Sequence, residues 1–289
     1  MIRRSLFVRF RSATLAVAAI GFVLLRWGAP VAGAAETTGE ILLNLTFDDK
    51  KADDDLTAEW RFFAQASSTT ANLTPAQAQR EGAKFVVKDD PTSPGNKVLQ
   101  LAGGDTALPD AFLYVPSLTH AEINKGDYTA VQLDYYAQPG LKKAGKKKID
   151  KRAGPYRIGV LGLVDPDDKT VYGAWTRWSD RQVRAGKMTA GVQDIKRSSK
   201  MGKRKDINKW YTIRAEFTRT GEQLEIKGKM WDRARGEAKA KVVTATQTVP
   251  WTAKKTFAIG IFQYTDSDKY GYDKRFIDNI KVIRAQQQK

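Results

Sequence analysis

The middle segments of the chain carry polar and aromatic side chains of the kinds that bind small polar ligands. Aromatic rings stack on sugar faces, while amide, carboxylate, hydroxyl and guanidinium groups hydrogen-bond to sugar hydroxyls. Packing of the same residues in a core, or their scatter over a sheet, is the structural alternative. If alternation places them on one face, these types predict a ligand groove formed by Gln132, Asp134, Tyr136, Arg157, Trp175, Arg177, Gln263 and Tyr264.

Acid-base hydrolysis is not favoured by the spacing of the carboxylates. A retaining glycoside hydrolase needs two carboxyl groups about 5–5.5 Å apart, which alternation can supply from one strand. The segment 132–136 offers Asp134 alone, without a second acid on that segment. Glu216 and Glu225 fall in the polar phase of two other segments, so we expect both to face solvent.

Nucleophilic and lyase chemistry have little support from the residue types. His120 is the only histidine, cysteine is absent, and no Gly-x-Ser-x-Gly sequence occurs. A polysaccharide lyase neutralises a uronate with Arg or Gln and moves protons with Tyr or His. Gln132, Tyr136 and Arg157 are of those types, but no Arg-x-Glu-Leu-Arg or Gln-Ile-His motif is present. We therefore expect binding without catalysis, with lyase and glycoside hydrolase activity as alternatives.

Charge indicates an anionic partner. The chain has 49 Lys and Arg against 32 Asp and Glu, a net charge of +17. Much of the excess falls in 141–152 and 179–205, which lack apolar periodicity and are expected to be solvated basic loops. Such loops attract polyanions through a salt-sensitive term. An anionic polysaccharide or anionic cell-envelope polymer fits this charge, and no module for specific nucleic-acid binding is visible.

Residues 1–34 are typical of a secretory signal peptide. Arg3, Arg4, Arg9 and Arg11 precede an apolar run from Leu15 to Leu25, and Ala32-Gly33-Ala34 offers a cleavage site. We expect a secreted or periplasmic protein, residues 35–289, with no transmembrane segment after cleavage; an uncleaved anchor is the alternative.

Alternation of apolar and polar residues dominates the rest of the chain. The segments 211–217 and 224–230 predict a hairpin across Thr220-Gly221, and 156–164 with 170–178 predict another. Further strands are expected at 41–47 and 276–283, and a short helix at 75–81. Roughly a dozen strands in a single domain, with no convincing amphipathic helix, predict an all-β sandwich.

A family resemblance rests on three segments. They read Trp210-Tyr211-x-Ile213, then Leu224-x-Ile226-x-Gly228-x-Met230-Trp231-Asp232, then Ile277-Asp278-Asn279-Ile280-x-Val282. The pattern resembles secreted bacterial concanavalin A-like lectin and glucanase domains, including laminin-G-like ones. The resemblance implies a two-sheet antiparallel jelly-roll sandwich whose first and last strands lie side by side. Because this fold hosts many functions, it fixes no activity.

The same resemblance implies a structural Ca²⁺ near the first and last strands. By position, Asp48 and Asp278 would be its ligands, and hard carboxylate oxygens suit Ca²⁺. The alternative is that Asp48 belongs to an ordinary turn and Asp278 to an ion pair. Trp210 and Trp231 are expected to be scaffold. The sequence predicts an exported carbohydrate-binding protein, with a structural envelope or adhesion module as a further alternative.

Overall fold

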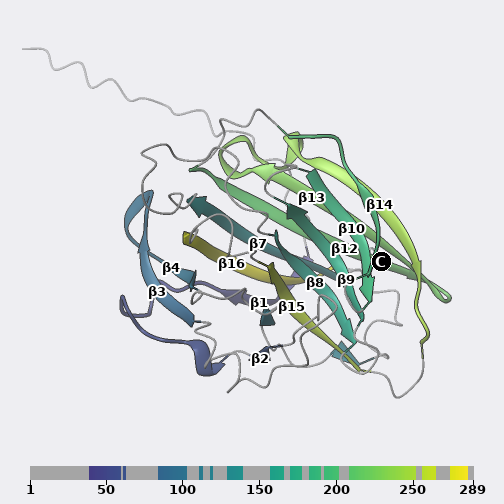
Figure 1. Cartoon of the computed structure of the whole chain (residues 1–289), viewed down its shortest axis with the longest axis horizontal. Coiled ribbons are helices and arrows are strands. Elements are labelled where there is room, and N and C mark those ends of the chain that lie inside the picture. Colours follow the sequence, from purple (N-terminus) through teal and green to yellow (C-terminus); the bar gives the residue numbers. More distant parts are fainter. Residues whose placement is uncertain are drawn as a thin grey trace, which may run out of the picture. The chain divides into compact units, whose positions relative to one another are not determined.

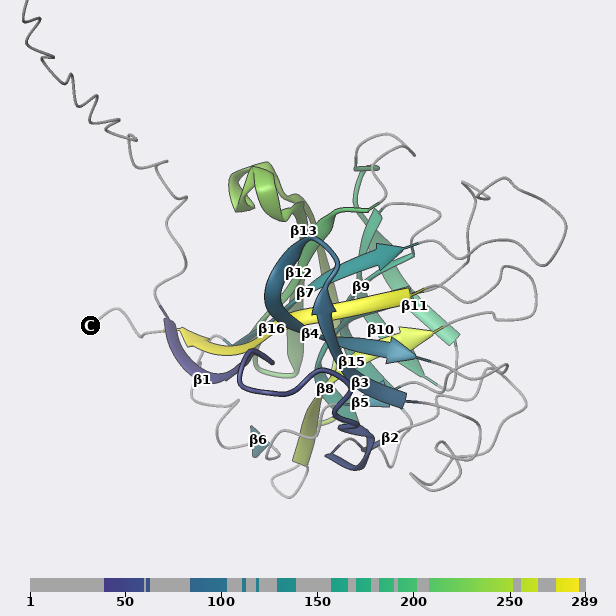
Figure 2. The ribbon, with the colours of Figure 1, turned by 90° about the vertical axis from the view of Figure 1, so that its left-hand side faces the viewer.

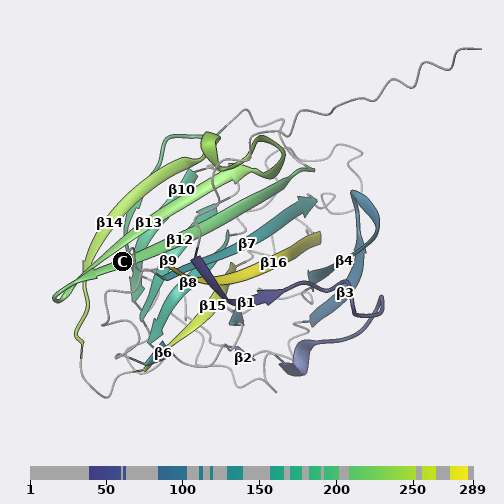
Figure 3. The same cartoon turned by 180° about the vertical axis from the view of Figure 1, so that it is seen from behind.

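The computed structural model describes residues 39–59, 61–62, 84–102, 111–112, 118–119, 129–138, 157–165, 170–177, 182–189, 192–201, 208–251, 256–264 and 274–285. These residues belong to one compact unit, Ala34–Lys289. Every strand pair among them is antiparallel, and the strands form two main sheets (Figures 1 and 3). Across this part of the chain, no helix has the length and apolar character needed to span a bilayer.

The larger sheet has eight strands within the described residues. Its order is β14 (Lys241–Thr248), β13 (Gln223–Asp232), β12 (Trp210–Thr220), β7 (Thr129–Gln138), β16 (Lys274–Ala285), β4 (Ser93–Ala102) and β3 (Lys84–Asp90). β1 (Gly39–Leu45) also pairs with β16, on the half of β16 that β4 leaves open (Figure 2). The first and last described strands therefore lie side by side, as the resemblance implies.

The smaller sheet has six strands among the residues described. Its order is β11 (Val192–Arg197), β10 (Gln182–Thr189), β9 (Thr170–Arg177), β8 (Arg157–Asp165), β15 (Thr256–Tyr264) and β6 (Leu118–Thr119). A separate pair joins β2 (Arg61–Phe62) to β5 (Ala111–Phe112). Short 3₁₀ helices are η1 (Thr57–Glu59), η2 (Arg233–Arg235) and η3 (Glu237–Lys239).

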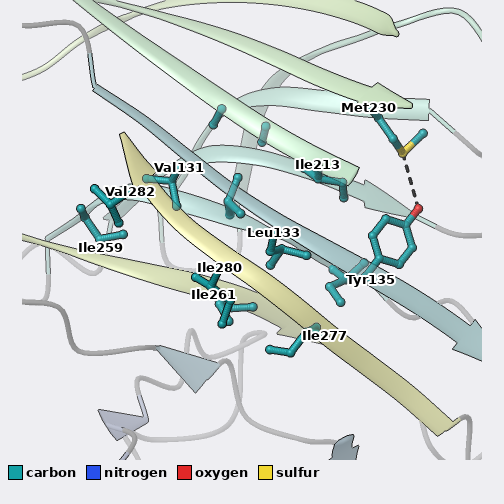
Figure 4. Close-up of a cluster of buried hydrophobic side chains, with 14 of the residues drawn as sticks. Val131, Leu133, Tyr135, Ile213, Met230, Ile259, Ile261, Ile277, Ile280 and Val282 are labelled. Atoms are coloured by element: carbon teal, nitrogen blue, oxygen red, sulfur yellow. Dashed lines mark hydrogen bonds between the residues drawn. The ribbon is translucent and has the colours of Figure 1, made fainter. Parts of the chain in front are cut away.

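The core lies between the two sheets and is built by alternation. Successive side chains of a strand point to opposite faces, so every second residue of β7 and β12 is buried against the facing sheet. Figure 4 shows Val131, Leu133 and Tyr135 in this layer with Ile259 and Ile261 from β15. The Tyr135 hydroxyl lies 3.6 Å from Met230 Sδ. Burial of these apolar side chains is the main stabilising term of the sandwich.

The sheets approach closely at Gly228 of β13. A Cβ at this position would lie 3.1 Å from Ala174 Cβ, 3.2 Å from Ala185 Cβ and 3.2 Å from Val183 Cγ2, all on the smaller sheet. Small side chains on both sides thus set the separation of the sheets here.

The fold class and both hairpins are confirmed. β12 pairs with β13 from Tyr211–Asp232 to Thr220–Gln223, and β8 pairs with β9. The structure is all-β and antiparallel in two sheets, the arrangement expected of a jelly-roll sandwich. The helix expected at 75–81, the signal segment 1–34, the loop 141–152 and His120 lie outside the described residues.

The expectation that the second basic segment, 179–205, is a solvated loop is wrong. β10 and β11 form a hairpin there, joined edge to edge with β9. Val183 and Ala185 are buried in the core between the sheets, whereas Met188 is buried on the opposite face of β10 with Trp175 and Val171. Apolar residues therefore fall in both phases of β10, with the buried Arg184, whose Nη1 lies 3.4 Å from Gln193 Oε1, and the small Gly186 between them, so the segment shows no simple period of two.

The expectation that Glu216 faces solvent is also wrong. Its side chain is buried on the outer face of the larger sheet and lies 3.2 Å from Arg214 and 2.6 Å from Lys229. Lys229 also lies 2.7 Å from Glu237 of η3. Neighbouring charges and η3 cover this part of the sheet, so a polar phase in β12 does not imply exposure. Glu225, in contrast, is exposed.

We predict that Gly228→Val lowers the free energy of unfolding by about 1–3 kcal/mol, because two methyl groups must enter a fully occupied layer. Denaturant unfolding followed by fluorescence measures the change. Thr246→Val, on the exposed face of β14, is the control and should stay within about 0.5 kcal/mol of the parent. Equal stability of the two variants would contradict the close approach.

Candidate functional site

Two aspartates lie next to each other on the outer face of the larger sheet. Asp134 of β7 is in register with Asp278 of β16 on one side and with Thr212 of β12 on the other. Both carboxyl groups are buried. Asp134, the one acid of segment 132–136, thus has an acidic neighbour in Asp278 of the adjacent strand. The expectation that Asp134 stands without a second acid holds for its own strand only.

Hydrogen bonds hold the carboxylate pair, Asp134 and Asp278. Thr212 Oγ1 donates to Asp134 Oδ1 at 2.6 Å. Asn279 Nδ2 donates to both residues, at 3.0 Å to Asp134 Oδ2 and 3.1 Å to Asp278 Oδ2. Arg233 Nη1 lies 3.5 Å from Asp134 Oδ2. Asp278 Oδ1 has no hydrogen-bond partner within the described part of the chain.

A bulge in β16 explains how Asn279 reaches both carboxylates. The register between β16 and β7 shifts between Asp278 and Lys281, and Asn279 has φ of 49°. Asparagine tolerates this left-handed conformation better than most residues. The extra residue lets Asp278 and Asn279 both face outward while Ile277 and Ile280 stay in the core.

Burial and mutual repulsion perturb the pair. Burial, joined by the charge of Asp134, raises the pKa of Asp278 to about 6, against hydrogen bonds from Asn279 and Asn96 and the charge of Arg233. Burial also raises the pKa of Asp134, although Thr212, Arg233 and Asn279 oppose the shift. Near pH 6 the pair can therefore gain or lose a proton.

A pocket of about 790 Å³ opens above Asp278 on this face. Its lining comes from the ends of β3, β4, β12, β13 and β16, from η2 and from the turn after β1. Ten of the twelve lining side chains are polar or charged, and the other two are Trp210 and Ala234. The ten are Asp48, Asp90, Thr92, Ser93, Asn96, Lys209, Asp232, Arg233, Asp278 and Asn279.

One wall is the turn between β3 and β4. Asp90 Oδ1 accepts from the Thr92 backbone N–H and hydroxyl, both at 2.7 Å, and Asp90 Oδ2 accepts from Asn96 Nδ2 at 3.1 Å. Trp210 Nε1 donates to Thr92 Oγ1 at 2.9 Å. Burial alone would raise the pKa of Asp90, but hydrogen bonds from Thr92, Asn96 and Trp210 outweigh it and lower the pKa.

The opposite wall is the end of β13 with η2. Asp232 caps η2 by accepting from the Ala234 N–H at 3.0 Å. Its Oδ2 also lies 3.4 Å from Lys209 Nζ and 3.6 Å from Arg235 Nε. The Arg233 guanidinium lies 5.8 Å from the centroid of the Trp210 ring. The cations of this wall are thus arranged around carboxylates and an indole.

The predicted ligand residues do not share one face. Asp134 and Tyr136 contact pocket residues, with Tyr136 5.5 Å from the Trp210 ring, and Gln132 lies one row further along β7. The strands of the smaller sheet carry the other five, on β8, β9 and β15. Trp175 is 0% exposed and packs 5.7 Å from Phe262. The side chains of Arg157, Arg177, Gln263 and Tyr264 lie outside the described residues.

The two predicted calcium ligands, Asp48 and Asp278, line the same pocket. Asp48 Oδ1 accepts from the Lys97 backbone N–H at 3.0 Å, and the buried Asp278 Oδ1 has no hydrogen-bond partner among the described residues. No group of three or more acidic, histidine or cysteine side chains converges tightly enough for a metal in the residues described. A calcium ion would need further oxygen ligands, and it stays a prediction.

Sequence reasoning missed most of the pocket. Asp90, Thr92 and Asn96 lie at a turn and were not candidates. Trp210 was expected to be scaffold, although it is both a packed side chain and part of the lining. Lys209 and Arg233 belong to no motif, and Asp232 entered only through the family resemblance. One available signal was the pair Asp278-Asn279 between Ile277 and Ile280, since two polar residues between core residues break the period of two.

Comparison with known proteins gives no relative in sequence: no family model and no curated protein matches. Solved structures match at low identity. Arcelin-5 from Phaseolus vulgaris is 6% identical at a TM-score of 0.45, covering 84% of this chain and 97% of its own.

Winged bean acidic lectin, solved with methyl-α-D-galactose, is 9% identical at a TM-score of 0.45, covering 86% of this chain and 100% of its own. The carbohydrate-binding module CBM66 from Bacillus subtilis is 17% identical at 0.36, with 69% and 91% covered. Values this low say nothing about a ligand of this chain.

We predict that Asp278→Asn stabilises the protein at pH 7.5 by roughly 1–3 kcal/mol and that the gain disappears near pH 4. The raised pKa of Asp278 contributes stability that is fully present below the unfolded value and lost as pH rises through about 6. An asparagine cannot ionise, so the variant does not lose this stability as the pH rises. Denaturant unfolding of the parent and the variant at both pH values measures the difference in free energy of unfolding.

Asp49→Asn, an exposed carboxylate outside the pocket, serves as the control and should show no such pH-dependent gain. A stability difference for Asp278→Asn that is the same at pH 4 and pH 7.5 would contradict the burial of an ionising group at this position.

Proposed function

We propose that this protein binds carbohydrate in the pocket above Asp278. The observation that carries the proposal is the polar lining: ten of twelve side chains are polar or charged around a cavity of about 790 Å³. Pockets of this volume hold small ligands, but most are predominantly apolar. A polyhydroxylated ring, which presents donors and acceptors around its whole edge, matches the lining.

Trp210 forms part of the pocket wall and offers little ring surface for a sugar to stack on. Its side chain is 9% exposed, its indole N–H donates to Thr92 Oγ1, and Arg233 lies near its ring. Recognition would therefore rest mainly on hydrogen bonds, with the edge of the indole limiting the apolar face of a sugar. This differs from stacking on exposed rings, which the sequence favoured.

We propose that the protein binds the sugar without catalysing a reaction. Asp134 does not line the pocket, and hydrogen bonds from Thr212 and Asn279 occupy its two oxygens. Asp90 is held by donors from Thr92, Asn96 and Trp210. Of these three buried carboxyl groups, only that of Asp278 has an oxygen without a hydrogen-bond partner among the described residues. The proposal therefore assigns these groups to binding and not to a two-carboxylate mechanism.

The net charge supports a separate, long-range step. Without residues 1–34, which hold five arginines and no acid, the net charge of +17 becomes +12. A chain of this charge attracts anionic polymers at low salt, and the attraction weakens as ions screen it. We propose that an exported form meets an anionic polysaccharide or envelope polymer in this way, and that the pocket then selects a sugar unit.

The test is to block the pocket without touching its hydrogen-bond network. Ser93 is exposed and lines the pocket, so Ser93→Trp fills the opening. Thr246→Trp places the same side chain on the exposed face of β14 and is the matched control. On an array of neutral, amino and uronate glycans, we expect Ser93→Trp to lose at least about tenfold in affinity.

Thr246→Trp should bind as the parent protein does. Repeating the array at two salt concentrations separates the two steps, since only the long-range attraction should fall with salt. If no glycan binds, or if Ser93→Trp binds as well as the control, the pocket is not the carbohydrate site.

A further inference from the structure

The pocket is acidic inside a strongly basic protein. Its lining has four carboxylates, Asp48, Asp90, Asp232 and Asp278, against two cations, Lys209 and Arg233. Asp134 lies directly beside Asp278 and adds a fifth carboxylate. The overall charge of the chain is +17, so the local sign is opposite to the global one. What enters the pocket is therefore selected by different electrostatics from what approaches the surface.

The two cations of the lining already face carboxylates. Lys209 Nζ lies 3.4 Å from Asp232 Oδ2, and Arg233 Nη1 lies 3.5 Å from Asp134 Oδ2. An anionic sugar unit would have to compete with these pairs and approach Asp278 as well. The pocket thus disfavours a uronate or sulfate group at its base.

The group of the lining that lacks a hydrogen-bond partner is an acceptor, the Asp278 carboxylate. Asp278 is 4% exposed, lines the pocket and has no hydrogen-bond partner for Oδ1 among the described residues. A buried carboxylate without a donor is costly, and a ligand that supplies one removes part of that cost. Asp48, on the same lining, is exposed and gives a second negative charge at the opening.

We propose that the pocket recognises a sugar with a free, protonated amine, and that the ammonium group pairs with the Asp278 carboxylate. This inference rests on the proposed carbohydrate-binding function and names the class of sugar. An ammonium brings three donors and a positive charge, so it supplies a donor that this carboxylate lacks and offsets the repulsion between Asp134 and Asp278. A hydroxyl supplies a donor but no charge, and an N-acetyl group removes the charge and adds bulk.

The experiment compares two matched oligosaccharides by calorimetry with the whole chain. A β-1,4-linked tetrasaccharide of glucosamine carries free amines, and its N-acetylated counterpart carries none. At pH 7 we expect the amine form to bind at least about tenfold more tightly. Asp278→Asn should abolish this preference.

Asp194→Asn is the charge-matched control. It removes one exposed carboxylate from the smaller sheet and should leave the preference unchanged. Equal binding of the two oligosaccharides, or a preference that survives Asp278→Asn, overturns the inference but not the carbohydrate site. The inference is also overturned if only glycans without amines bind. It is overturned as well if Asp278 is needed for binding Ca²⁺ and the bound Ca²⁺ excludes the amine form. Absence of binding to any glycan on the array overturns the carbohydrate proposal itself.

Discussion

The central strands of the larger sheet are buried on both faces, and this constraint shapes the rest of the structure. In β12 every residue from Trp210 to Phe217 is buried, although only alternate residues face the smaller sheet. The outward residues include charged ones, and a buried charge must be paired or hydrogen-bonded. Polar groups on the outer face are therefore satisfied mostly by one another.

That requirement is met differently along the sheet. Glu216 lies beside Arg214 and Lys229, so a buried acid faces one buried and one half-buried cation. Two rows away Asp134 and Asp278 are in register, and two carboxylates cannot neutralise each other. The bulge at Asn279 and the guanidinium of Arg233 compensate in part. Asp278 Oδ1 has no hydrogen-bond partner among the described residues, and Asp278 lines a pocket, which is why we place the function there.

The sequence predicted those parts of the fold that depend on local pattern. Alternation in 211–217 and 224–230 with a tight turn between them is enough to predict β12 and β13. The basic hairpin of β10 and β11 was missed because buried apolar residues fall on both faces of β10, so that it shows no simple alternation, and because the outward Arg184 is buried as well. The pattern of one segment does not show which residues of neighbouring strands hydrogen-bond to a buried polar side chain.

The site depends on order within the sheet, which no single segment encodes. Asp134 meets Asp278 because β7 pairs with β16 over 130 residues later in the chain. Asp278 was singled out as a metal ligand and Asp134 as a sugar ligand, and their contact joins the two hypotheses in one place. Trp175 had a suitable type but lies on the other sheet, fully buried.

The most direct measurement is the titration of the Asp278 carboxyl carbon by NMR in the ligand-free protein. Burial beside Asp134 predicts an apparent pKa near the value of about 6, coupled to a second transition at Asp134. A single transition close to the ordinary value of about 3.9 would contradict the account, because Asp278 would then be neither desolvated nor opposed by a neighbouring carboxylate.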